Sequence, residues 1–480
     1  MFFSGAHTLP YRFQLTLDSV QQSDSLPFTD TLSQDQIQAV CVRHNVPIRD
    51  NEDQIYDPST TLWGFLSQVI HRKEQRACLA AVIRIGKMLL VLCGRFICMN
   101  NSGAYCRARK ELPTGVVVDL TKELAADCSE GCPKDWLWFG RQIECLDGTT
   151  VTMPDTAANQ EAYPQLPGQK EGLGFPIARL VAVFSLATGM LKNLAMGPYQ
   201  GKQTGETALL RTIMDGFRAN SIVLMDKLFS NYWTIADFLA RQVDVVTLHH
   251  ASRTLDLSNA TRLGPNDCVI TWFRPGRPKW MDQAIYELIP KTLVLRIIQG
   301  QIRKPGFRVE TVTIVTTLLN ATKYRSDDVI SLYRQRWNVE LNIRAIKVQM
   351  GMDDLRCQTP DMVQKEIWTC MLAYNLIRLK LLQAAQKKGV PPLSLSFTYG
   401  LQTVVADWML VFAVSPELQE RLYEADLKGI GKRQVGNRPD RIEPRAVKRR
   451  PKPTPLLTMP RAEARSLQIA TGVDPFKKQK

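Results

Sequence analysis

One segment of the 480-residue chain, YRQRWNVELNIRAIK, holds a phenol, two cations and a carboxylate at helical spacing. These side chains are Tyr333, Arg336, Glu340 and Lys347, and in an α-helix they would fall within an arc of roughly 60°. Apolar residues border the arc on both sides, which predicts a helix that is packed on two flanks. One flank would hold Leu332, Val339, Ile343, Ile346 and Met350, and the other Trp337, Leu341 and Val348.

Charged side chains between packed flanks need partners or a ligand. The simplest partner lies within the helix, because Arg336 and Glu340 are four residues apart and could form an internal ion pair. A ligand of opposite charge is the alternative. The segment alone does not choose between these two interpretations.

Two aspartates elsewhere in the chain stand where strands are predicted to end. The alternating segment RQIECLDGTTVTM reaches a turn signal at Asp147-Gly148. Asp226 closes SIVLMD, a short apolar run that is typical of a buried central strand. Polar groups at strand ends project beyond the sheet, where α/β folds usually place their sites. Each aspartate also has a structural explanation, as a turn residue for Asp147 and as a helix cap for Asp226.

With Glu340, the two aspartates would form a group of three carboxylates that repel one another unless cations bind. Hard oxygen ligands favour Mg²⁺ or Mn²⁺. Two such ions could polarise a phosphodiester, activate a water or hydroxyl and stabilise the leaving oxygen. Arg336 and Lys347 would then hold phosphates near the metals. Other candidate ligands are interpreted as structural: Glu144, Asp155, the Cys128/Cys132 pair, His249 and His250.

The net charge of +15 and the sequence pI of about 9.3 favour a polyanionic partner, either nucleic acid or an anionic membrane surface. The N-terminus MFFSGAHTLPYRF lacks the features of a signal peptide. The most apolar segment is interrupted by Arg84, Lys87 and Arg95, so we expect a buried helix rather than a membrane span. Eleven cysteines, an odd number, suit reduced thiols in the cytoplasm.

The pattern of predicted elements divides the chain into five regions. Residues 1–130 read as mainly helical, and 131–249 as strands followed by alternating helix and strand, which predicts an α/β sheet covered by helices. Residues 250–318 read as a mostly β insertion, and 319–425 as helices. Residues 426–480 form a basic tail with 15 Lys and Arg against 5 Asp and Glu, including RAVKRRPKP.

These segments resemble the insertion-sequence-four family of DDE transposases. LYRQRWNVELNIRAIK matches that family's Y-(2)-R-(3)-E-(6)-K signature. LDGTTVTMPDTAAN and VLMDKLFSNYWTIADFLARQVDVV are similar to its first and second aspartate segments. LWGFLSQV with AYCRARKELP resembles its N-terminal region, and RAVKRRPKP followed by MPR resembles its tail, so the likeness runs in patches from about residue 60 to 461.

The resemblance implies an RNase H-like catalytic core interrupted by the β insertion, with a helical N-terminal DNA-binding domain. It implies that two Mg²⁺ or Mn²⁺ ions bind at Asp147, Asp226 and Glu340, and that the other three signature residues contact the phosphates of the transposon ends: Tyr333, Arg336 and Lys347. It also implies cut-and-paste movement of double-stranded DNA, often through a hairpin, by a dimer that cuts paired ends.

Two positions bear on how closely the chain follows the family. Lys227 stands where the family often has arginine after the second aspartate, and it keeps the charge but not the bidentate fork. Some relatives hold a flipped base against a tryptophan in the β insertion, where this chain offers Trp272 and Trp280.

Two other functions fit parts of the sequence. A decayed or domesticated relative would bind DNA without cutting it, but all three carboxylates are present. A tyrosine recombinase would use Tyr333 as its nucleophile. That chemistry needs Arg and His around the phosphate, and the five histidines form no recognisable arrangement of that kind.

Overall fold

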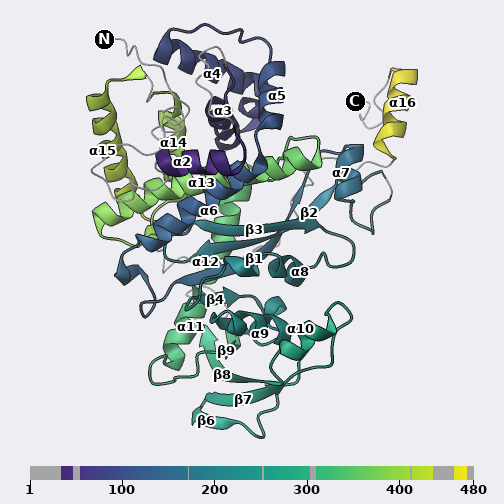
Figure 1. Cartoon of the computed structure of the whole chain (residues 1–480), viewed down its shortest axis with the longest axis vertical. Coiled ribbons are helices and arrows are strands. Elements are labelled where there is room, and N and C mark those ends of the chain that lie inside the picture. The colour runs from purple at the N-terminus through teal and green to yellow at the C-terminus, as the bar shows by residue number, and fades with distance from the viewer. Residues whose placement is uncertain are drawn as a thin grey trace, which may run out of the picture.

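The computed structural model describes residues 34–46, 55–170, 172–250, 253–302, 310–410, 413–435 and 459–472. A nine-stranded sheet runs through the molecule, with most helices gathered at one end of it and a group of antiparallel strands at the other (Figure 1). The basic segment RAVKRRPKP, at 445–453, lies outside the described residues.

The described part of the N-terminal region, residues 34–46 and 55–130, is largely helical. Helix α3 begins where the carboxylate of Asp57 accepts a hydrogen bond from the Thr60 amide at 2.9 Å, with Pro58 in the first turn. Helix α4 ends at Gly94, whose φ of 66° closes the helix in the left-handed region. The helices are α2 (Gln34–Arg43), α3 (Pro58–Ile70), η1 (Lys73–Arg76), α4 (Cys78–Cys93), α5 (Gly103–Glu111) and α6 (Thr114–Glu130).

The first five strands form one half of the sheet in the order β3-β2-β1-β4-β5. Strands β1, β2 and β3 are antiparallel neighbours, and β4 and β5 run parallel to β1. Successive side chains of β1 and β4 enter two different hydrophobic cores, so this half is covered on both faces. The strands are β1 (Ile143–Thr152), β2 (Ile177–Ser185), β3 (Leu191–Pro198), β4 (Ile222–Met225) and β5 (Asp244–Leu248).

Three short helices lie in the connections between these strands: α7 (Ala157–Ala162) between β1 and β2, α8 (Glu206–Arg211) between β3 and β4, and α9 (Tyr232–Ala240) between β4 and β5.

The β-rich segment continues the same sheet rather than folding separately. Strand β9 pairs antiparallel with β5, and β8, β7 and β6 follow in order. The fully buried Arg296 binds Asp267 at 2.8 Å and the carbonyls of Leu318 and Tyr324, which joins the segment to the chain that follows it. Its elements are β6 (Thr261–Gly264), β7 (Asp267–Phe273), α10 (Gln283–Leu288), β8 (Thr292–Ile302) and β9 (Glu310–Thr316).

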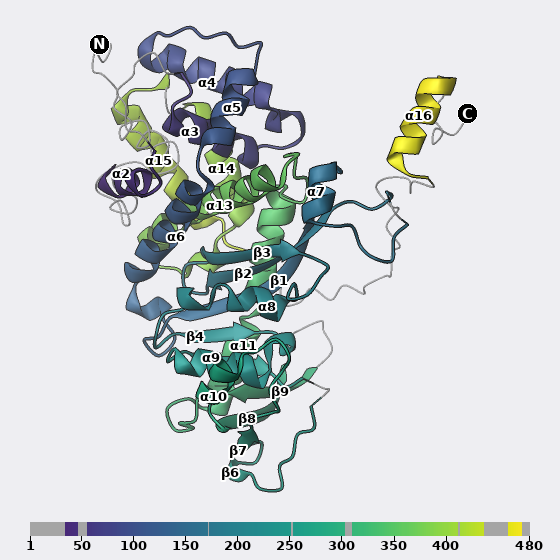
Figure 2. The same cartoon turned by 45° about the vertical axis from the view of Figure 1, so that its right-hand side comes forward.

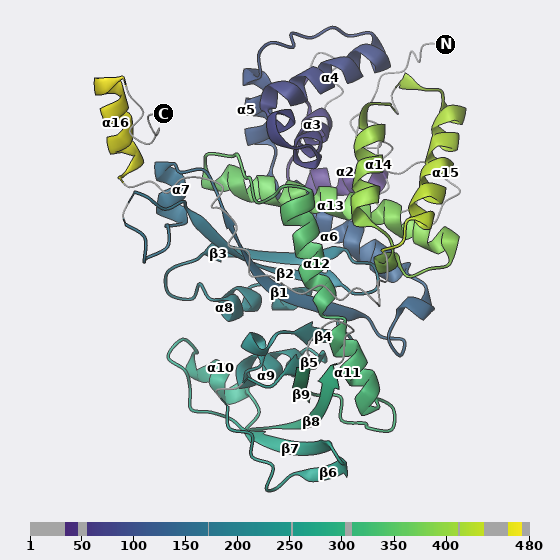
Figure 3. The ribbon, with the colours of Figure 1, turned by 180° about the vertical axis from the view of Figure 1, so that it is seen from behind.

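Helices complete the chain: α11 (Ser326–Arg334), α12 (Trp337–Arg344), a π-helix (Ala345–Gln349), α13 (Pro360–Lys388), α14 (Phe397–Leu410), α15 (Pro416–Lys432) and α16 (Arg461–Thr471). Seen from behind, α12 crosses the middle of the molecule between α13 and α11 (Figure 3). Helix α15 extends past residue 425, and its Leu427 and Ile430 are buried, so packed structure continues into the segment predicted as tail. Helix α16 lies to the side of the body beyond α7 (Figure 2).

Helix α13 is the central helix of the helical part, and Asn375 fixes it to the sheet. The Asn375 side chain accepts from the Leu191 amide at 2.9 Å and donates to the carbonyls of Leu191 and Thr121 at 2.9 and 3.1 Å. One buried amide thereby links α13, β3 and α6. Since each of these bonds lies away from water, the three elements are held in a defined arrangement.

Within the described residues, no helix is long and apolar enough to cross a membrane.

Candidate active site

Asp147 lies in the middle of β1, and the turn predicted at Asp147-Gly148 is wrong. Strand β1 continues to Thr152 because β2 pairs with it along this whole length, including Asp147 with Ala182 and Gly148 with Val181. The parallel neighbour β4 stops at Met225. Strand β1 therefore extends past the end of β4, and Asp147 lies partly buried at that edge, within a strand rather than at the end of one.

Asp226 ends β4, as predicted, and lies beside Asp147 in register. The last registered pair of the two strands joins Cys145 to Leu224, and each aspartate lies two residues beyond its member of that pair. Side chains two residues apart point to the same face. Asp226 also caps the short η4 helix (Lys227–Phe229), accepting from the Lys227 amide at 2.6 Å.

Arg336 joins the first aspartate to the glutamate of the signature. One guanidinium nitrogen lies 3.7 Å from Asp147 Oδ2, and another donates to Glu340 Oε1 at 3.0 Å. The predicted internal ion pair between Arg336 and Glu340 is present, and the same guanidinium also lies near Asp147. Burial opposes the charge on Arg336, but Tyr333, Asp147 and Glu340 outweigh it and raise the pKa of the guanidinium.

The helix predicted over 333–347 is interrupted. Helix α11 ends at Arg334, and the backbone tightens through i→i+3 hydrogen bonds, among them Arg336 N to the Tyr333 carbonyl at 3.0 Å. The chain then loosens into the π-helix that contains Lys347. Tight and wide turns inside a helix are typical of functional sites, because they re-aim side chains that regular spacing would place elsewhere.

Only one of the two predicted flanks is packed. Leu332, Val339 and Ile346 are buried, but Trp337, Leu341 and Val348 are 49%, 46% and 50% exposed. Asn342, on the same helix, is buried and accepts from Arg378 at 2.7 Å. Arg378 is on α13 and also donates to the Tyr374 hydroxyl at 2.8 Å, which anchors α12 to the central helix. The helix therefore packs on the side of Asn342.

The two remaining signature residues lie in different environments. Lys347 donates to the Thr150 carbonyl at 2.8 Å and to the Thr149 hydroxyl at 3.3 Å, so it lies along β1 just beyond Asp147. Burial lowers the pKa of its ammonium group, and Asp353 partly opposes that shift. Tyr333 is 5% exposed, so its side chain is not accessible as the nucleophile that a tyrosine recombinase would need.

The pKa of Asp147 depends on its burial and on the charged groups at this edge. Burial raises the pKa of the carboxyl to about 6, the Gly148 amide and Arg336 lower it, and the charges of Glu340 and Asp226 raise it. In the part of the chain that the structure describes, no group of three or more His, Cys, Asp or Glu side chains is placed to hold a metal. Arg336 is the cation that contacts two of the three carboxylates.

Glu206 is a fourth carboxylate at this edge, and the sequence analysis missed it. A Cβ atom added to Gly148 would lie 2.2 Å from the Glu206 carboxyl carbon, so the two residues are in direct contact. Burial raises the pKa of Glu206, Arg179 lowers it and Asp226 raises it further. The only signal in the sequence is a glycine after the first aspartate and an acidic residue at the start of a short helix.

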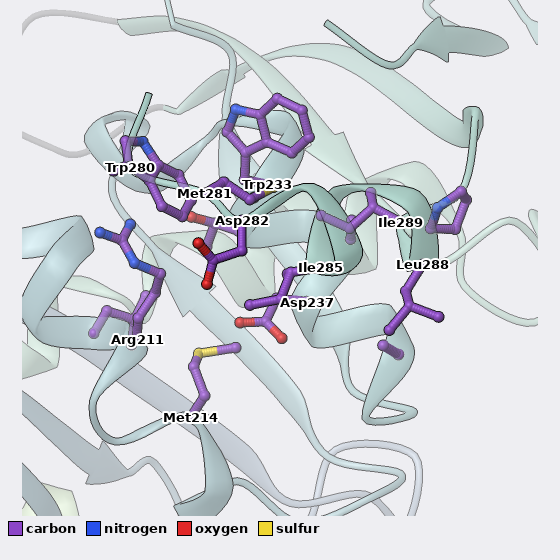
Figure 4. A pocket seen from close by; sticks show the side chains of 15 residues that line it. Arg211, Met214, Trp233, Asp237, Trp280, Met281, Asp282, Ile285, Leu288 and Ile289 are labelled. Atoms are coloured by element: carbon purple, nitrogen blue, oxygen red, sulfur yellow. The ribbon is translucent and has the colours of Figure 1, made fainter. Parts of the chain in front are cut away.

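A cavity of about 410 Å³ lies at the other end of α8. Trp233 on α9, Trp280 ahead of α10 and the apolar side chains of Leu288 and Ile289 line it (Figure 4). The Arg211 guanidinium, five residues after Glu206, lies 4.0 Å from the centre of the Trp280 ring. Trp272 is on β7, outside this lining, with Arg253 over its ring at 4.6 Å.

Other side chains singled out in the sequence are parts of the framework. Glu144 is buried in an ion pair with Lys192. Trp138 stacks on Tyr324 with ring centres 5.3 Å apart. The ten cysteines whose side chains are described, among them Cys128 and Cys132, are free thiols.

The basic segment near residue 107 is only partly available to a ligand. Tyr105 is fully buried, and Arg109 packs over the Phe65 ring at 4.5 Å and donates to Gln68 at 2.9 Å. Arg107 and Lys110 remain on the surface.

Comparisons with known proteins identify the class of this chain. Residues 138–376, which contain all three carboxylates, match the family model described as the transposase DDE domain. The chain belongs to the DDE transposases, enzymes that move DNA and that generally use divalent metal ions.

Within that class it is a member of the family of insertion sequence element IS4, as the signature indicated. Transposase InsG of that element, from Escherichia coli (strain K12), is 25% identical over 325 residues, which are 65% of this chain and 69% of InsG. The putative transposase InsZ of the same strain is 32% identical over 128 residues, which are 26% of this chain and 42% of InsZ.

Among solved structures, a piggyBac transposase synaptic complex with hairpin DNA aligns over 87% of this chain and 85% of its own. The TM-score is 0.42 and the identity 11%.

The raised pKa of Asp147 predicts a pH-dependent cost of keeping this carboxylate ionised. Between about pH 4 and 6 the folded protein holds a proton that the unfolded chain releases, so stability falls as pH rises through this window. Asp147→Asn removes that titration. In EDTA the variant should match the wild type near pH 4 and be more stable above pH 6, by on the order of 1–3 kcal/mol. Urea unfolding at several pH values measures this, and a difference that does not change with pH would contradict it.

The contact between Gly148 and Glu206 predicts that Glu206→Ala removes the loss of stability caused by Gly148→Ala. Gly148→Ala alone should push the Glu206 carboxylate away and lower stability by about 1 kcal/mol. When Glu206→Ala has removed that carboxylate, the same change should be neutral or favourable, because alanine suits a strand better than glycine. Thermal unfolding of both single variants and the double variant tests this. An equal loss from Gly148→Ala in both backgrounds would show that the contact has no effect.

Proposed function

We propose that this transposase cuts double-stranded DNA at the terminal inverted repeats of an insertion sequence and joins the freed element to target DNA. The observation that carries the proposal is the convergence of Asp147, Asp226 and Glu340. These residues come from widely separated parts of the chain and lie around one edge of the sheet, where Arg336 contacts two of them.

The donor atoms fit a hard divalent cation. All three proposed ligands are carboxylates. Burial is the main cause of the raised pKa of Asp147, the charges of Glu340 and Asp226 add to it, and a bound cation would favour the ionised form. We assign Asp147, Asp226 and Glu340 as the ligands of two Mg²⁺ or Mn²⁺ ions. When bound, these ions would supply charge stabilisation to a phosphodiester under attack and to its leaving oxygen.

The chain's own cations hold the DNA strand at this edge. Lys347 lies along β1 next to Asp147, where its ammonium group can exchange hydrogen bonds to Thr149 and Thr150 for a phosphate. Arg336 offers a planar fork that suits a phosphate as well as it suits the carboxylates that it contacts. The Tyr333 ring packs beside Arg336, with its centre 6.0 Å from the guanidinium carbon.

The order β3-β2-β1-β4-β5, with β1 antiparallel to β2 and parallel to β4, supports an RNase H-like core for residues 131–249 and 319–425. The helical region 1–130 is the proposed DNA-binding domain, with Arg107 and Lys110 as exposed cations. The basic tail, 426–480, adds charge that attracts DNA without reading its sequence. Two copies on paired ends form the active unit, at the bacterial nucleoid in the cytoplasm.

Incubation of the protein and Mg²⁺ with a duplex that carries the flanking terminal repeats tests the proposal directly. The wild type should cut at the repeat ends, and Asp147→Ala, Asp226→Ala and Glu340→Ala should each lower cleavage by about 10³-fold or more. End binding and thermal stability should persist. Asp155→Asn is the matched control, since this carboxylate follows the same strand but is not assigned to the site. Near-normal cleavage by any of the three alanine variants would remove that residue from the ligand set.

Trp280 is the better candidate for holding a flipped base, if the ends form hairpins as in some relatives. It lines an apolar cavity with Trp233, and α8 leads from this cavity back to Glu206 at the acidic edge. A 2-aminopurine base placed next to the cleaved bond should brighten on leaving the stack and be quenched against the indole. Trp280→Ala should change that fluorescence and slow hairpin formation. Trp272→Ala should not, and the reverse pattern would assign the role to Trp272.

A further inference from the structure

Two arginines of the N-terminal region, Arg72 and Arg76, contact the C-terminal end of the helical segment that carries Glu340 and Lys347. Arg72, just before η1, donates from Nε to the Gln349 carbonyl at 3.0 Å and from Nη2 to the Val348 carbonyl. Carbonyls at the end of a helix have no following turn to bond with them. A guanidinium at this position satisfies them and complements the negative end of the helix.

Arg76 binds the loop that leaves the π-helix. Its Nη1 donates to the Gly351 carbonyl, and its Nη2 donates to Glu366 Oε1 at 2.9 Å. The two side chains of this ion pair are only 2% and 4% exposed. A buried ion pair of this kind is costly to break, because removing one partner leaves the other charge without compensation.

Glu366 carries the connection onward to the rest of the loop. Its second oxygen accepts from the amides of Arg356 and Cys357, each at 3.0 Å. Gly351 reverses the chain with a φ of +80°, which glycine adopts without strain. Residues 351–357 are thus held between η1 and the beginning of α13, immediately after the turn that carries Lys347.

We propose that Arg76, assisted by Arg72, is a positioning residue for the transposase reaction. It fixes the end of the π-helix and so sets where Lys347 lies along β1, which makes the geometry of the active site depend on the N-terminal helical region. The inference rests on the proposed contact of Lys347 with the DNA strand. Displacement of a reacting group by about 1 Å can cost about 10²-fold in rate.

Arg76→Gln against Arg84→Gln is the matched comparison. Arg84 is similarly buried, but it donates to Ser67 and Gln75, inside the N-terminal region. Both variants should lose stability and keep end binding within about threefold. Only Arg76→Gln should slow single-turnover cleavage at saturating DNA and Mg²⁺, by roughly 10- to 100-fold per folded molecule. Equal cleavage by the two folded variants would overturn the proposal.

Arg72→Gln keeps the test decisive if Arg76→Gln does not fold, because Arg72 is exposed. Its control is Lys73→Gln, the neighbouring exposed cation. Arg72→Gln should speed hydrogen exchange of the amides in 350–357 and slow cleavage severalfold, and Lys73→Gln should change neither. Unchanged exchange in this loop and unchanged cleavage in Arg72→Gln would contradict the positioning role.

The double variant Arg76→Gln/Lys347→Met separates this inference from the proposed function. If Arg76 acts through Lys347, the double variant should cleave no more than two- to threefold slower than the slower single variant. Multiplied losses would overturn the inference and leave the role of Lys347 intact. Normal cleavage by Lys347→Met would instead remove the proposed phosphate contact, and the positioning role with it.

Discussion

Repulsion among carboxylates at one edge of a buried sheet is the constraint on which the rest of this structure depends. Asp147 and Asp226 lie side by side on adjacent parallel strands, and Glu340 approaches the same edge from α12. Arg336 offsets part of this charge by contacting Asp147 and Glu340 with one guanidinium. Burial is the main cause of the raised pKa of Asp147, and the charges of Glu340 and Asp226 add to it, so further positive charge at this edge would favour the ionised carboxylate.

The surrounding framework keeps these like charges together. Asn342 ties α12 to Arg378 of α13, and Asn375 ties α13 to β3 and α6, so the helix that carries Glu340 is fixed relative to the sheet. The N-terminal region holds the other end of the same helix through Arg72 and Arg76. Folding energy gained in these cores and networks maintains an edge that is electrostatically unfavourable by itself, as is common for active sites.

The sequence predicted the parts of the site that depend on local pattern. Asp226 follows a short apolar run, and that run is a central strand because both of its faces are buried. The turn predicted at Asp147 is wrong, since the length of β1 is set by pairing with β2, which local alternation cannot reveal. Helical spacing identified Arg336 and Glu340 as partners, but it could not anticipate the tight turn and the π-helix that re-aim the side chains around them.

Contacts between distant segments account for what the sequence did not show. Trp337, Leu341 and Val348 have the spacing of a packed flank but are about half exposed, because the helices that could have covered them pack on the side of Asn342 instead. Glu206 carries no motif, and its place in the site follows from the missing side chain at Gly148. In the sequence, Arg72 and Arg76 resemble ordinary surface charges. Their role follows from contacts with the end of the helical segment that carries Lys347, which only the fold shows.

The central claim is that Arg336 acts as the internal counter-ion of the carboxylates that we propose as metal ligands. Titration of Mn²⁺ into wild type and Arg336→Gln, followed by electron paramagnetic resonance, tests it most directly, with Asp226→Ala as the variant that lacks a ligand. Because loss of Arg336 leaves Asp147 and Glu340 with more uncompensated charge, Arg336→Gln should bind Mn²⁺ severalfold more tightly while Asp226→Ala binds it more weakly. Unchanged or weaker Mn²⁺ binding by Arg336→Gln would contradict the account.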